Sequence, residues 1–220
     1  MIGLDQGWRT DRLSLEPLTV AHAAELAPLL DDRSLHEFTG GAPLSAAALA
    51  ARYARLAARR SPGGDQLWGN WVLRVRATGE AAGTVQATLP AAGPAAGPAE
   101  VAWVVVRAAQ GRGYASEAAR SLVAALREAG WTVVAYIHPG HLASQRVARA
   151  AGLSLTAGTR DGEMRWASPA AGPNARSGAT STCLLMLSGY TLMPQRAEIS
   201  GPLRSATHRA FDRWAWERVS

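Results

Sequence analysis

One stretch of the chain, residues 99–119, constrains the fold more than any other. An apolar run of mostly β-branched residues is followed by a loop that contains Gly111 and Gly113, and then by an alanine-rich segment. Glycine has no Cβ, so it allows positive φ angles and a close approach to a ligand. The first N–H groups of a helix have no partners within the helix. The stretch therefore predicts a strand, a glycine loop and a helix N-terminus that bind an anion, most naturally a phosphate.

Two common nucleotide-binding motifs do not fit this loop. A Walker loop needs a lysine to reach the phosphates, and every one of the 23 basic residues is an arginine. A dinucleotide fingerprint needs a third glycine or alanine where Ser116 stands, and an acidic residue at the end of the next strand. The predicted next strand, residues 131–137, ends instead in His138-Pro139-Gly140.

A third pattern fits better. The segment Gln110-x-x-Gly113-x-Ala115 resembles the pyrophosphate loop Gln/Arg-x-x-Gly-x-Gly/Ala of the GNAT acetyltransferase superfamily. A helix is predicted from about residue 113 to residue 129, with Gly130 as its C-terminal stop, and the strand over residues 131–137 follows.

A second motif supports the same resemblance. Residues 141–153 read His-x-x-Ser-x-x-Val-Ala-x-x-x-Gly-Leu and resemble the superfamily signature Asn-x-x-Ser/Ala-x-x-Leu/Val-x-x-x-x-Gly-Phe/Leu, with His141 in place of asparagine. Ser144 is typical of the branch that acetylates ribosomal-protein N-termini. The resemblance covers roughly residues 8–167.

The resemblance implies an α/β (α+β) GNAT fold, in which a mixed, mostly antiparallel central sheet is flanked by helices and two central parallel strands splay apart. We expect residues 1–168 to form the acetyltransferase domain. Residues 169–220 are expected to be a linker and a C-terminal extension, because residues 168–181 are rich in Pro, Gly, Ser, Ala and Asn. That extension is either docked on the domain or poorly ordered.

Local patterns predict further elements. Alternating apolar and polar residues favour a strand over residues 12–18. Residues 68–76 and 82–89 are expected to be two strands of a hairpin, joined around residues 78–80. Thr19 is expected to cap a helix that buries Ala23, Leu26, Leu29 and Leu30, and Ser45 a second helix. Asp161-Gly162 indicates a type I′ hairpin.

Composition narrows the setting of the protein. No apolar run approaches the ~18 residues of a membrane span, the N-terminus lacks the apolar core of a signal peptide, and Cys183 is the only cysteine. We therefore expect a cytoplasmic protein without membrane contact, either a monomer or a homodimer.

The net charge of +6 is shared equally between residues 1–169 and 170–220. A coenzyme with several phosphates accounts for this mild charge, and nucleic-acid binding ranks last because base-reading motifs are absent.

The resemblance also assigns residues to acetyl-coenzyme A. The strand residues would pair with the pantetheine arm, an N–H near Val104 would polarise the thioester carbonyl, the loop would hold the pyrophosphate, and the second motif would line the same site. The implied coenzyme residues are Trp103, Val104, Val105, Val106, Gln110, Gly111, Arg112, Gly113, Tyr114, Ala115, Ser116, His141 and Ser144.

Direct acyl transfer requires an acid for the leaving thiolate and a neutral amine. Ser144 is the candidate acid, since Ala148 stands where many relatives carry a tyrosine. An ordinary helix serine bonded to a backbone carbonyl is the competing interpretation. Glu100 is the candidate base, acting through a water; Glu163, Glu37 or no dedicated base are alternatives.

The loop between the first two predicted helices flanks the acceptor in relatives. Phe38, Thr39 and Gly40 are therefore candidate acceptor residues. Trp71, in the strand that follows, is a candidate for the wall of the same cleft. Core or turn packing is the competing interpretation for all four. His138 and His141 are not expected to bind a metal, because no cysteine or carboxylate cluster accompanies them.

The resemblance carried by the two motifs implies an acetyl-coenzyme A dependent N-acetyltransferase. The acceptor is left open between a protein N-terminal α-amine, an aminoglycoside and another small amine. A coenzyme-binding module without catalysis is the main alternative.

Overall fold

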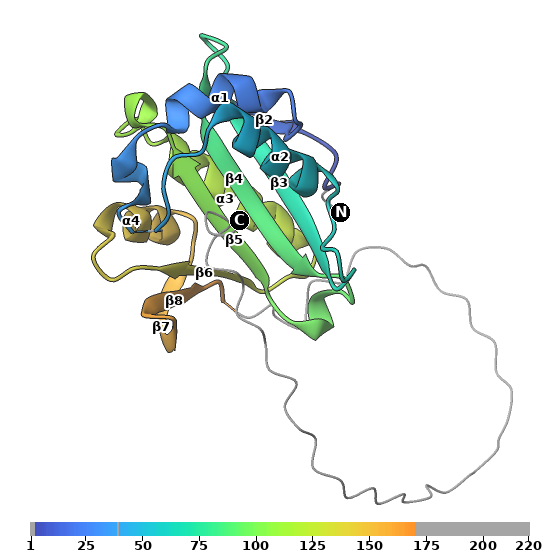
Figure 1. Cartoon of the computed structure of the whole chain (residues 1–220). Helices are drawn as coiled ribbons and strands as arrows, with labels where there is room; N and C mark the ends of the chain where they lie inside the picture. Colours follow the sequence, from blue (N-terminus) through green and yellow to red (C-terminus); the bar gives the residue numbers. More distant parts are fainter. Residues whose placement is uncertain (1–2, 39, 170–220) are drawn as a thin grey trace, which may run out of the picture. The chain divides into compact units, whose positions relative to one another are not determined.

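The computed structural model describes residues 3–38 and 40–169 of the 220-residue chain. These residues form an eight-stranded sheet in the order β1-β2-β3-β4-β5-β6-β8-β7, with four α-helices (Figure 1). The strands are β1 (Trp8–Arg9), β2 (Leu13–Pro17), β3 (Gln66–Val75), β4 (Ala81–Pro90), β5 (Ala99–Val105), β6 (Val133–Ile137), β7 (Ser154–Arg160) and β8 (Glu163–Ala167). The helices are α1 (His22–Leu30), α2 (Ala46–Ala57), α3 (Tyr114–Glu128) and α4 (Leu142–Ala150), with short 3₁₀ turns η1 (Arg33–His36), η2 (Pro94–Ala96) and η3 (Arg107–Ala109).

The central strands β5 and β6 form the sole parallel pair among the described strands. They pair only at Ala99 with Val133 and at Glu100 with Val134, and then separate. Both expectations for the sheet, a mostly antiparallel order and splayed central parallel strands, are confirmed.

Helices cover both faces of this sheet. In Figure 1, α1 and α2 lie over β2–β4, and α3 crosses behind β4 and β5. Successive strand residues point to opposite faces. Arg74 of β3 accordingly contacts Glu25 of α1. On the other face Trp71 packs against Trp8, whose indole N–H donates to Ser121 of α3.

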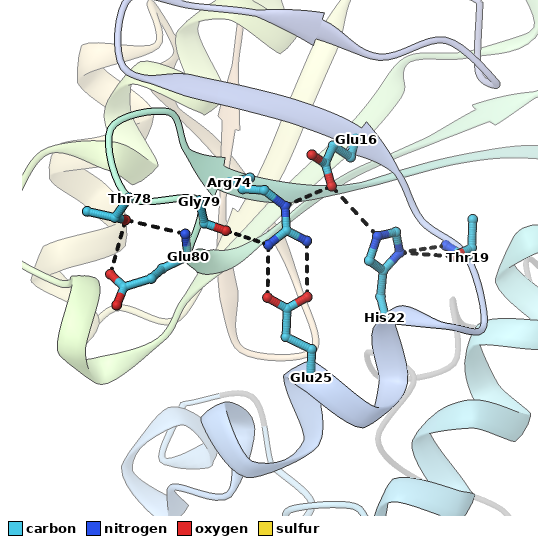
Figure 2. Close-up of polar contacts among 8 residues, drawn as sticks. All are labelled: Glu16, Thr19, His22, Glu25, Arg74, Thr78, Gly79 and Glu80. Atoms are coloured by element: carbon cyan, nitrogen blue, oxygen red, sulfur yellow. Dashed lines mark hydrogen bonds and ion pairs between the residues drawn. The ribbon is translucent and has the colours of Figure 1, made fainter.

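Ion pairs and hydrogen bonds around Arg74 connect α1 to the sheet (Figure 2). Arg74 donates to both carboxylate oxygens of Glu25 at 2.9 and 3.0 Å, to Glu16 at 2.9 Å and to the Gly79 carbonyl at 2.7 Å. The hydrogen bond from Arg74 is the main cause of the lowered pKa of Glu25. The network fixes the helix that leads into residues 31–41, the loop expected to flank the acceptor.

Several local predictions are confirmed by backbone geometry. The Ser45 hydroxyl accepts from the Ala48 N–H at 3.2 Å and caps α2. Gly130, just after α3, has a φ of 88°. Asp161 and Gly162 have φ angles of 51° and 83°, and both central residues of a type I′ turn require positive values.

Two predictions about α1 are wrong. The helix begins at His22 after Ala21, so Thr19 is not its cap; the Thr19 N–H instead donates to His22 Nδ1 at 3.0 Å. Leu29 is 36% exposed. The buried stripe is Ala23, Leu26, Ala27 and Leu30, which follows the i, i+3, i+4, i+7 spacing of one helix face.

In the described part of the chain, no helix is both long enough and apolar enough to span a bilayer.

Candidate active site

The predicted coenzyme loop lies between η3 and α3. Gly111 and Gly113 have φ angles of 75° and 79°, the left-handed conformation that the sequence predicted for them. Both glycines are exposed. No heavy atom lies within 4 Å of a Cβ placed on Gly111. A bound group can therefore approach the backbone here without displacing a side chain.

The first turn of α3 presents its N–H groups beside this loop. The Glu117 N–H is the first to bond within the helix, to the Gly113 carbonyl at 3.1 Å. The N–H groups of Tyr114, Ala115 and Ser116 precede it and have no intrahelical acceptor. Together with the positive end of the helix dipole, they favour an anion at this position.

The open edge of β5 follows from its pairing with β4. The Val106 N–H donates to the Ala82 carbonyl at 2.9 Å, and the register between the strands is unbroken. Along a strand, the N–H and C=O groups of successive residues point alternately to one neighbouring strand and then to the other. The N–H and C=O groups of Val104 therefore also face β4. Those of Trp103 and Val105 face β6, where no strand pairing is recorded for them among the described residues.

This geometry corrects part of the coenzyme assignment. Val104 and Val106 direct their N–H groups at β4, so neither can donate to a ligand between the splayed strands. The donors that face this space are the N–H groups of Trp103 and Val105. The Val105 carbonyl accepts from Gln110 Nε2 at 3.1 Å, which ties the glycine loop to the end of β5.

Helix α4 carries the second motif. Ser144 is half-buried in its first turn, and its hydroxyl has no hydrogen-bond partner among residues 3–38 and 40–169. The alternative of a serine bonded to a helix carbonyl is therefore not observed. Ala148 is fully buried and offers no acid.

The acceptor loop meets the turn before α4. The Phe38 ring stacks on His141 with 4.5 Å between centroids and lies 5.4 Å from the His138 ring. Burial lowers the pKa of His141, opposed by the nearby Glu37 carboxylate. Gly40 is exposed with a φ of 76°. Thr39 lies outside the described residues.

Trp71 does not line an acceptor site. Its side chain is 0% exposed, and its indole N–H donates to the Gln6 carbonyl at 2.9 Å. The residue belongs to the core between the sheet and α3, which agrees with the competing interpretation of core packing.

Glu100 is already engaged by a residue the sequence did not single out. Arg160 donates to both Glu100 carboxylate oxygens at 2.8 and 2.6 Å, and its guanidinium lies 3.6 Å from the Tyr136 ring centroid. A carboxylate held on both oxygens is poorly placed to accept a proton from an amine. The structure thus argues against Glu100 as the base.

Glu163, one of the alternative bases, pairs with Arg160 at the turn between β7 and β8. It begins β8, is half-buried, and interacts electrostatically with Arg160, Glu100 and His138. Burial raises its pKa above the ordinary value, although Arg160 opposes the shift. A raised pKa makes a carboxylate more basic and brings it nearer the range needed for proton transfer at neutral pH.

Among residues 3–38 and 40–169, no group of three or more His, Cys, Asp or Glu side chains is arranged to hold a metal ion.

Comparison with known proteins defines the family. A family model described as an acetyltransferase (GNAT) domain matches residues 12–154, more than half of the chain. The chain therefore belongs to the GNAT acetyltransferases, and its sheet with splayed central strands is the GNAT fold. No curated protein sequence matches this chain.

Solved structures agree with this assignment. A GNAT-family acetyltransferase from Bordetella pertussis is 26% identical, with 74% of this chain and 97% of that chain covered and a TM-score of 0.55. The RimL acetyltransferase of ribosomal protein L7/L12, in complex with coenzyme A, is 16% identical, with coverages of 76% and 99% and a TM-score of 0.60. The enzyme AAC(6')-Ib, in complex with paromomycin and acetyl-coenzyme A, is 21% identical, with coverages of 77% and 100% and a TM-score of 0.59. The last two likenesses show the fold alone.

Proposed function

We propose that this protein transfers an acetyl group from acetyl-coenzyme A directly to a primary amine. The observation that carries the proposal is the junction of two features: the gap between β5 and β6, and the positive-φ glycine loop that leads into α3. The first offers backbone donors to a thioester and its pantetheine arm. The second offers helix N–H groups to a pyrophosphate.

Acetyl-coenzyme A would supply an acetyl group activated as a thioester. The N–H groups of Trp103 and Val105 are the donors available to polarise its carbonyl, because both face the gap. One preorganised donor of this kind contributes about 3 kcal/mol to a transition state. The loop residues from Gln110 to Ser116 would hold the phosphates.

Ser144 is the proposed acid for the departing thiolate. Its hydroxyl lies in the first turn of α4, directly after β6, and is not committed to any described residue. Glu163 is the proposed base, since partial burial raises its pKa and Glu100 is held by Arg160.

The acceptor is proposed only as a class. RimL and AAC(6')-Ib share this fold but are named for a ribosomal protein and an aminoglycoside complex, so the fold does not choose between a protein α-amine and a small-molecule amine. Phe38 and Gly40 are the proposed acceptor-side residues, because this loop contacts the turn before α4.

Thiol release from acetyl-coenzyme A tests the proposal against a panel of N-terminal peptides, aminoglycosides and polyamines. Turnover with one of these amines is the expected result. Replacement of Ser144 by alanine should lower kcat about 100-fold while coenzyme affinity changes little.

Full turnover in Ser144→Ala would remove the serine from the mechanism. Tight coenzyme binding without turnover across the panel would favour the non-catalytic coenzyme-binding module instead.

A further inference from the structure

A buried carboxylate lies in the first turn of α3, beside the proposed pyrophosphate site. Glu117 is buried, and its Oε1 accepts from the Thr10 hydroxyl at 2.6 Å and from the Arg12 backbone N–H at 2.8 Å. Its Oε2 accepts from Arg12 Nε at 2.7 Å. Burial raises the pKa of Glu117, but these hydrogen bonds outweigh that effect and leave the pKa below its usual value. The carboxylate is therefore charged, and Arg12 neutralises it next to a site for anions.

The same guanidinium extends beyond Glu117 to the glycine loop. Arg12 Nη1 donates to the Arg112 carbonyl at 2.8 Å, and the guanidinium carbon lies 5.0 Å from the Tyr114 ring centroid. A Cβ placed on Gly113 would lie 3.4 Å from Arg12 Nη2. The Arg12 side chain is 50% exposed. Within the described residues, Nη2 has no acceptor.

We infer that Arg12 is a coenzyme-binding residue, which donates from Nη2 to a phosphate of the coenzyme while Nε and Nη1 hold it against Glu117 and the loop. A planar guanidinium can serve these partners at once, because its N–H groups point in fixed and different directions. The inference rests on the proposed function, since it assumes that a phosphate occupies the glycine loop. It adds a contact from the β1–β2 segment, about 100 residues before the loop in the chain.

The test is calorimetric titration of the full chain with coenzyme A and with pantetheine, which lacks the phosphates. Arg12→Gln should weaken coenzyme A binding about 10- to 100-fold, the scale of one hydrogen bond to a charged group. Pantetheine binding should not change. Arg76→Gln is the matched control: Arg76 donates to the carbonyls of Thr10 and Asp11 in the same segment. It removes one positive charge there, and coenzyme affinity should stay at the wild-type value.

A second variant separates direct contact from loop support. Glu117→Gln keeps the Arg12 side chain but loses one of the two carboxylate oxygens that hold its segment, so coenzyme A affinity should fall less than in Arg12→Gln. An equal loss of affinity in Glu117→Gln and Arg12→Gln would mean that the pair only supports the loop, and would overturn the inference. Equal affinities of Arg12→Gln and Arg76→Gln would overturn it as well.

Folding of each variant is checked by its melting temperature. Should Arg12→Gln fail to fold, Arg12→Lys is the substitute, because it keeps the positive charge but lacks the planar guanidinium with its several N–H donors. Its coenzyme A affinity should still be several-fold lower than that of the wild type. Wild-type affinity in Arg12→Lys would refute the contact. Absence of coenzyme A binding to the wild-type chain is a different result, because it refutes the proposed function itself.

Discussion

Replacement of Gly113 by valine tests the coenzyme loop most directly. Gly113 has φ and ψ angles of 79° and 6°, so an L-residue there is in the left-handed region. This conformation costs about 1–2 kcal/mol for an ordinary residue, and a β-branched residue is disfavoured further. The steric term is smaller, since the one heavy atom near a Cβ at residue 113 is Arg12 Nη2, at 3.4 Å. Backbone conformation, rather than crowding, therefore decides the effect.

In Gly113→Val this conformational strain is relieved if residue 113 changes to a negative φ. That change alters the directions of the N–H groups that follow it in the first turn of α3. Loss of one hydrogen bond to a charged phosphate is worth about 1.5–3 kcal/mol. The Kd for coenzyme A should therefore rise about 10- to 100-fold. Calorimetric titration measures this Kd, and urea unfolding should show a free energy of unfolding reduced by about 1–2 kcal/mol.

Gly79→Val is the matched control. Gly79 lies in the turn between β3 and β4, has a φ of 76°, and has no heavy atom within 4 Å of a Cβ placed on it. It should lose similar stability with unchanged coenzyme affinity. The reasoning is refuted if a folded Gly113→Val protein binds coenzyme A like the wild type, or if Gly79→Val weakens binding equally.

Three further predictions concern the base, the core and the domain boundary. A general base acts in its ionised form, so wild-type kcat/KM should rise as the pH increases through the raised pKa of Glu163. Glu163→Gln should lower kcat about 100-fold and remove this rise from the pH profile. A variant with an unchanged pH profile would exclude Glu163 as the base. Trp71→Ala should reduce the free energy of unfolding by about 3–5 kcal/mol in urea titrations and leave the acceptor KM unchanged, whereas a change in KM alone would restore its acceptor role. A chain shortened to residues 1–169 keeps Ser168, whose hydroxyl accepts from the Val133 N–H, and should melt cooperatively and bind coenzyme A; loss of the transition would place the domain boundary later.

The sequence by itself determined the features that depend on a few neighbouring residues. Positive φ at Gly111 and Gly113, the Ser45 cap and the Asp161-Gly162 turn are confirmed, because each follows from local sterics or a local hydrogen bond. The family resemblance that the two motifs carry also implied the splay of β5 and β6, which the pairing confirms.

Tertiary structure alone decided which charged and aromatic side chains face the site. Arg160 reaches Glu100 across 60 positions, and Arg12 reaches Glu117 across 105. Strand order in the sheet creates the first contact, and the packing of α3 on the sheet creates the second, so no local pattern predicts either one. Trp71 points into the core for the same reason, since the sheet face that a strand residue occupies is fixed by pairing and by the helix packed on it.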